Sequence, residues 1–129
     1  MRRQVMVGVL CGSALAGMAQ AGDVQFARDV VPIFKTSCVM CHLPGNGPAG
    51  LALHPKGGYA NLVGVASTQS PLLRVDPGKP DESYLYRKLV GTHAEAGGSG
   101  ERMPFGDMQL GEEQIDVIRR WIADGAKAE

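Results

Sequence analysis

A five-residue run, Cys38-Val39-Met40-Cys41-His42, constrains this 129-residue chain more than any other feature. On one helical turn the two thiols lie at positions i and i+3 and the imidazole at i+4, so all three project from one side. Thiols at this spacing can add to the two vinyl groups of a porphyrin, and the adjacent imidazole can then bind the iron. The run therefore predicts one covalently attached haem c, held by Cys38, Cys41 and His42.

The same residues are compatible with three other kinds of site. A structural zinc site needs four ligands, and the remaining histidines, His54 and His93, stand alone in glycine-rich sequence. A thioredoxin-like redox pair follows a strand in a βαβ pattern, and no such pattern surrounds Cys38. A local disulfide in an oxidising compartment leaves His42 without a role. Haem attachment gives all three groups a chemical function.

The first 21 residues have the pattern of a cleavable secretory signal peptide. Arg2 and Arg3 form a basic start, residues 5–19 are apolar, and Ala19-Gln20-Ala21 fits an A-x-A cleavage site. An uncleaved anchor is the alternative, but the apolar stretch falls short of the ~20 residues that span a bilayer. We expect residues 1–21 to be removed and residues 22–129 to form one periplasmic domain without a membrane span.

Cleavage also changes the cysteine count and the charge of the chain. Cys11 leaves with the signal peptide, and Leu10 before it is too large for a lipoprotein site, so both remaining cysteines belong to the motif. Loss of Arg2 and Arg3 leaves 11 basic against 13 acidic residues, so nucleic acid is not an expected partner. A domain of this size buries about two-thirds of its unfolded surface, and a buried porphyrin would enlarge its core.

The first of three segments with a helical pattern runs into the motif. Asp29 is a good N-cap, and Pro32 falls in the opening turn, where its missing N–H costs nothing. One face of this helix is apolar and consists of Val30, Val31, Phe34 and Cys38. We therefore expect a helix that begins at Asp29 and delivers the cysteines at its end.

The other two helical segments lie in the second half of the chain. Asp81 to Ser83 form a start signal after Pro80, and Gly91 ends this short, half-apolar helix. The last helix has Glu112 in its first turn and ends at Gly125. Asp116 and Arg120 form an exposed i,i+4 pair on it. Its apolar stripe consists of Ile115, Ile118, Trp121 and Ile122. The pattern predicts an all-α fold.

Two long segments connect the three helices. About forty residues between the first and second carry recurring apolar side chains: Leu51, Leu53, Tyr59, Leu62, Val63, Leu72, Leu73 and Val75. A structureless loop of that length is unusual unless it wraps something, so we expect a wall over one haem face, with a helical turn or two in residues 58–65. An ordinary surface loop is the alternative. The second segment, residues 91–110, contains the loose run G-G-S-G before Met103.

Met103 is the candidate for the sixth ligand of the iron. A thioether favours ferrous haem, and Pro104 restricts Met103 to an extended backbone. The alternative is that Met103 only packs in the interior. Met108 is the reserve ligand, although we expect it to pack at the start of the last helix. Met40 lies on the wrong side of the porphyrin ring for this role. His93 would be the sixth ligand only if the glycine loop folded back.

The chain resembles a class I c-type cytochrome, and more narrowly the small cytochrome module of planctomycete-type secreted proteins. The resemblance rests on D-V-V-P-I-F, C-V-M-C-H, S-Y-L-Y-R-K-L, R-M-P and I-R-R-W-I-A-D-G-A, in this order. It implies a small cytochrome c fold with three main helices and long haem-wrapping loops, in which the first and last helices cross. Phe34 and Val30 would then meet Ile118 and Trp121. It also implies His42 and Met103 as axial ligands. Gly111 departs from the serine or threonine cap of the related sequences.

Together these features predict a mono-haem electron carrier without catalytic residues. The expected partners are periplasmic or membrane-bound redox proteins, and the resemblance suggests a dehydrogenase or a terminal oxidase or reductase among them. One alternative is a haem c protein whose sixth site is open or labile, acting as a sensor or a peroxidase-like enzyme. Another is a non-redox interaction module with haem as a structural staple.

Overall fold

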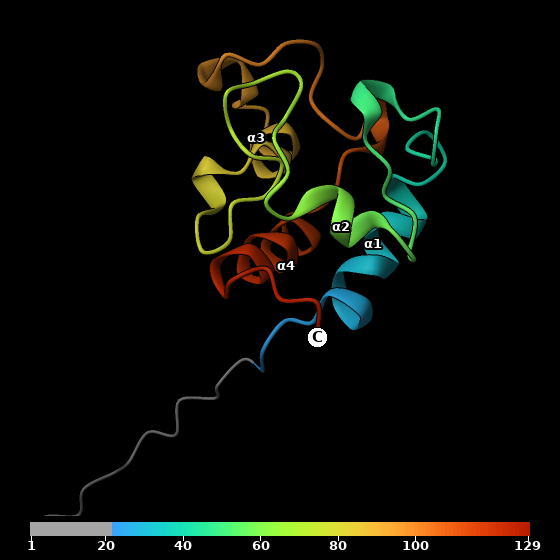
Figure 1. Ribbon diagram of the computed structural model, residues 1–129, viewed down its shortest axis with the longest axis vertical. Helices are drawn as coiled ribbons and strands as arrows, with labels where there is room; N and C mark the ends of the chain where they lie inside the picture. Colours follow the sequence, from blue (N-terminus) through green and yellow to red (C-terminus); the bar gives the residue numbers. More distant parts are fainter. Residues whose placement is uncertain (1–21) are drawn as a thin grey trace, which may run out of the picture.

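Four α-helices and five shorter helical turns make up residues 22–129 in the computed structural model (Figure 1). The α-helices are α1 (Val31–Ser37), α2 (Gly58–Leu62), α3 (Tyr84–Val90) and α4 (Glu112–Ala123). This part of the chain contains isolated β-bridges but no strand, so the domain is all-α, and α1, α3 and α4 correspond to the three main helices expected. None of its helices is both long and apolar enough to cross a membrane. Residues 1–21, with the predicted signal peptide and Cys11, lie outside the described residues.

The first helix begins earlier than the sequence pattern predicted. A single π-helical turn, η1 (Phe26–Val30), leads directly into α1, so Asp29 lies inside the helical segment and is not its N-cap. The Asp29 carboxylate instead accepts a hydrogen bond from the backbone N–H of Gln25 at 2.8 Å and pairs with Arg28 at 2.7 Å. The bond from Arg28, followed by that from Gln25, lowers the pKa of Asp29 to about 2. Pro32 occupies the opening turn of α1, as predicted.

The main core forms where η1 packs against α4. Trp121 and Ile118 are completely buried, and the rings of Trp121 and Phe26 lie 5.1 Å apart, centroid to centroid. The indole N–H of Trp121 donates to the carbonyl of Lys127 at 2.8 Å. Phe34 is buried in the same cluster, but Phe26 is the ring that stacks near Trp121, a contact that the sequence analysis did not predict. Val30, Phe34, Ile118 and Trp121 share one buried cluster, as the crossing of the first and last helices requires, and Phe26 ahead of the predicted helix adds to this contact.

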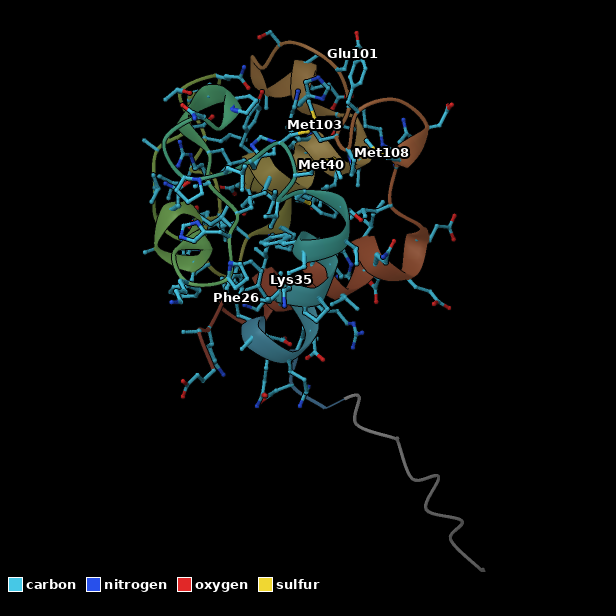
Figure 2. The ribbon with its side chains drawn as sticks, turned by 90° about the vertical axis from the view of Figure 1, so that its right-hand side faces the viewer. Phe26, Lys35, Met40, Glu101, Met103 and Met108 are labelled. Atoms are coloured by element: carbon cyan, nitrogen blue, oxygen red, sulfur yellow. The ribbon has the colours of Figure 1, made fainter. Side chains whose placement is uncertain are left out.

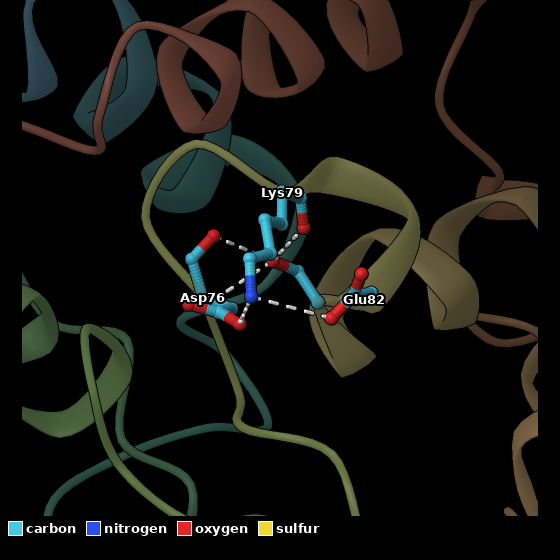
Figure 3. A network of polar contacts seen from close by, with 4 residues as sticks. Asp76, Lys79 and Glu82 are labelled. Atoms are coloured by element: carbon cyan, nitrogen blue, oxygen red, sulfur yellow. Dashed lines mark hydrogen bonds and ion pairs between the residues drawn. The ribbon is translucent and has the colours of Figure 1, made fainter.

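The start of α3 is fixed by a polar turn (Figure 3). Lys79 lies 3.3 Å from a carboxylate oxygen of Asp76 and 3.5 Å from one of Glu82. The Ser83 hydroxyl donates to the carbonyl of Lys79 and accepts from the N–H of Asp76, both at 2.8 Å. At the other end, Gly91 adopts a φ of 83° and ends the helix. Both predicted limits of this helix are confirmed.

The long segment between α1 and α3 is ordered by short elements. It contains η2 (Pro48–Gly50) and α2, and the latter confirms the helical turn expected in residues 58–65. Leu62 and Val75 are completely buried, and Val63 forms a parallel bridge with Val75. The Tyr59 ring lies 5.3 Å from the ring of Phe26, which joins α2 to the core. This segment therefore forms a wall of the domain.

Candidate functional site

A cavity of about 410 Å³ lies at the end of α1, between α3 and the two long connecting segments. Its volume falls within the roughly 300–1,000 Å³ typical of small-molecule and cofactor pockets. Cys38, Cys41, His42 and Met103 all line this cavity. The structure thus brings together every residue that the sequence analysis selected for the site, from both halves of the chain.

The cysteine motif forms one hydrogen-bonded turn directly after α1. The N–H of Cys41 and the N–H of His42 both donate to the carbonyl of Cys38, at 3.2 and 3.0 Å, which gives the predicted i, i+3, i+4 spacing. Both thiols are free. Burial, with a smaller effect from Cys41, raises the pKa of Cys38 to about 11. A catalytic redox thiol needs a lowered pKa, so Cys38 does not have the electrostatics of an attacking redox thiol.

His42 is held with one ring nitrogen on the backbone. Its Nδ1 lies 3.2 Å from the carbonyl oxygen of Leu51, a contact that places the ring proton on Nδ1 and leaves the lone pair of Nε2 available. Burial lowers the pKa of His42, which favours the neutral imidazole. A neutral imidazole oriented by a backbone carbonyl is the usual form of a metal-binding histidine.

The segment that carries Met103 is tied to α3 by hydrogen bonds. The N–H of Met103 donates to the carbonyl of Lys88 at 3.0 Å, and Arg102 Nε donates to the carbonyl of Leu89 at 2.7 Å. The Lys88 ammonium reaches back to the carbonyl of Glu101 at 2.5 Å. The glycine-rich segment, which the sequence analysis described as loose, therefore holds Met103 in one place against the helix.

The other three candidate ligands, of which Figure 2 labels Met40 and Met108, have different environments. His93 is buried away from the cavity, where its Nε2 lies 2.7 Å from the carbonyl oxygen of Gly100, so the structure does not support it as a distal ligand. Met108 lines the cavity but is 61% exposed, and the expected packing at the start of α4 is wrong, because Leu110 is the buried residue there. Met40 is 86% exposed and does not line the cavity.

The wall expected from the long segment is present in part. Leu51, Leu53 and Leu62 line the cavity, while the buried Val75 belongs to the core. Arg74 is a buried residue that also lines the cavity, and it was not among the predicted site residues. The available signal was its position as a charged residue within the apolar run Leu72-Leu73-Arg74-Val75.

Comparison with protein-family models, curated proteins and solved structures finds no match to this chain. The described residues 22–129 also hold no cluster of three or more histidine, cysteine, aspartate or glutamate side chains placed to bind a metal ion. The ligands of a four-coordinate zinc site are thus not assembled here. The cavity instead offers two thiols, one imidazole and the thioethers of Met103 and Met108 around largely apolar walls.

Proposed function

We propose that residues 22–129 are a periplasmic mono-haem c-type cytochrome with a small cytochrome c fold, which transfers single electrons between redox partners. One observation carries the proposal: Cys38, Cys41, His42 and Met103 line a single cavity of about 410 Å³. In this proposal Cys38 and Cys41 attach the haem through thioether bonds, and His42 and Met103 are its axial ligands.

The residues present fit such a group. The contact between Nδ1 of His42 and Leu51 leaves Nε2 free as a donor, and the thioether of Met103 is the soft ligand that favours ferrous iron. When bound, the haem supplies a one-electron couple between ferrous and ferric iron. The protein contributes apolar walls from Leu51 and Leu53, which exclude water, and the tethers to α3, which hold Met103 in place.

The proposed ligand pair determines the type of activity. A histidine and methionine pair gives a higher potential than two histidines, and filled axial positions leave no site for a substrate, so the protein is a carrier and not an enzyme. The signal-peptide pattern of residues 1–21 supports the periplasmic location in this proposal. Its partners are periplasmic or membrane-bound redox proteins, among them a dehydrogenase or a terminal oxidase or reductase.

The decisive experiment compares Met103→Ala with Met108→Ala in the full chain, produced with its haem attached. These are the same substitution at two methionines that line the same cavity. In the ferric wild type we expect a sulfur-to-iron charge-transfer band near the red edge of the visible spectrum. The band should vanish in Met103→Ala and survive in Met108→Ala, and the midpoint potential should fall only in the former, because a ligand that favours ferrous iron is lost.

Each remaining outcome assigns a different function or ligand. Survival of the band in Met103→Ala would transfer the axial role to Met108. Addition of carbon monoxide to the reduced wild type should leave its spectrum unchanged, since both axial positions are filled. A changed spectrum would indicate an open or labile sixth site, as in a sensor or a peroxidase-like enzyme. A purified chain without covalent haem by mass spectrometry would contradict the proposal as a whole.

A further inference from the structure

Arg74 is a buried cation without an anionic partner among the described residues. Its side chain is only 9% exposed and lines the cavity. Nη1 donates to the backbone carbonyl and to Oδ1 of Asn61, at 2.8 and 2.9 Å, and Nη2 donates to the carbonyl of Ala49 at 3.1 Å. All three acceptors are neutral, and none of the ion pairs within residues 22–129 includes Arg74.

Burial of an uncompensated charge is unfavourable, by several kcal/mol in typical proteins. Burial is also the single cause that lowers the pKa of Arg74, because no carboxylate acts on it in the opposite direction. Arg28 and Arg119 contrast with this, because both are surface residues and each is paired with a carboxylate at 2.7 Å. The domain therefore places one unpaired guanidinium in the wall of its cavity.

The guanidinium retains capacity for a further ligand. Arginine carries five N–H donors in a planar fork, and three of them are used by Asn61 and Ala49, so two remain. A planar fork with two remaining donors matches the two oxygens of a carboxylate, the most common bidentate partner of arginine. Neutral acceptors alone do not require a charged side chain at this position, whereas a carboxylate does.

We propose that Arg74 receives a carboxylate of the group bound in the cavity, and, resting on the proposed function above, that this carboxylate is a propionate side chain of the haem. The other buried cation that lines the cavity, Lys88, has a different role, because its ammonium binds the carbonyls of Ser99 and Glu101 and so anchors the segment of Met103. Arg74 thus compensates one negative charge of the cofactor and keeps that propionate ionised.

The test uses the haem-loaded full chain as wild type, Arg74→Gln, Arg74→Lys and the matched control Arg119→Gln, which removes an equal charge from the surface. Haem propionates labelled with carbon-13 are titrated by NMR, and the midpoint potential is measured against pH. In the wild type one propionate should stay ionised well below the ordinary carboxyl range of about 4 to 5. In Arg74→Gln its pKa should rise into or above that range, and the potential should fall and become dependent on pH as the propionate titrates.

The controls separate charge compensation from a purely structural role. Arg119→Gln should titrate like the wild type, and Arg74→Lys should retain a lowered propionate pKa because it retains the charge. If Arg74 serves only as a tether of Asn61 and Ala49, Arg74→Gln will lose thermal stability while its titration and potential match those of Arg119→Gln. That result would overturn the proposal.

If Arg74→Gln does not fold, the propionate titration of the wild type alone tests the role of Arg74. Two propionates that both titrate in the ordinary carboxyl range would overturn the role of Arg74 while leaving the cytochrome proposal intact. A wild type without covalent haem would overturn both proposals together. The two failures are therefore distinguishable by mass spectrometry of the wild-type protein.

Discussion

The two ends of the domain are stabilised in different ways. At the end near Phe26 in Figure 2, aromatic and aliphatic side chains pack directly on one another, and Trp121 and Ile118 are completely buried. At the end near Met103, the chain surrounds a cavity and is held by hydrogen bonds from side chains such as Lys88 to backbone carbonyls. Packing therefore supports the first end, whereas the second relies on polar tethers around a cavity.

The largest effect should follow loss of the attachment bonds at the cavity end. The double variant Cys38→Ala, Cys41→Ala should lose the covalent haem and most of the folded protein, because a domain of this size has a marginal core of its own. Mass spectrometry and thermal unfolding followed by circular dichroism would measure both effects. Cys11→Ser is the control, and its mature protein should keep the wild-type mass and colour. A double variant that unfolds cooperatively at the wild-type midpoint would show that the cavity end is stable by itself.

A smaller but still large effect is expected at the packed end. Trp121→Ala removes a buried ring and the bond from its N–H to Lys127, and should cost on the order of 3 to 5 kcal/mol in the free energy of unfolding. Denaturant unfolding of the haem-loaded protein would measure it. Leu43→Ala is the control, because Leu43 is 47% exposed and does not line the cavity, and its change should stay within about 0.5 kcal/mol. A cost below about 1 kcal/mol for Trp121→Ala would contradict the packing described here.

The smallest predicted effect concerns the polar start of the first helix. Asp29→Asn should reduce stability by roughly 0.2 to 1 kcal/mol at neutral pH, because it weakens the bonds to Gln25 and Arg28, which are largely solvent-exposed. The pKa of Asp29 is lowered from 3.8 to about 2, so its contribution is complete above pH 3.8 and is lost as the pH falls toward 2. Urea unfolding at several pH values should show the difference between wild type and variant shrinking over that interval. A difference that stays constant down to pH 2 would contradict this assignment.

Elements defined by local signals were predictable from the sequence. Gly91 and Gly125 end α3 and α4 where expected, because a helix end depends on the residues beside it. The start of the first helix was misplaced, because the π-helical turn at Phe26 lies ahead of the regular apolar pattern. The contact of Phe26 with Trp121 joins two distant segments, and no local pattern in the sequence indicates it.

The candidate site also contains features that were predictable from local sequence and features that were not. The spacing of Cys38, Cys41 and His42 is local and was therefore predictable, including the turn on which they lie. The surroundings of Arg74 were not predictable, because its bonds to Ala49 and Asn61 depend on how the long segment folds back on itself. Hydrogen bonds between distant segments do not produce a periodic residue pattern that a single sequence could reveal.

The tethers of Met103 have a consequence for the dynamics of the proposed iron site. The carbonyls of Lys88 and Leu89 lie in the last turn of α3, where a helix has no partners of its own for such groups. They are bonded by Met103 N–H and Arg102 Nε. The methionine segment and the end of the helix should therefore open together, as one cooperative unit in amide hydrogen exchange. Ligand replacement at the sixth position would then require fraying of α3, and its rate would report the local stability of that helix.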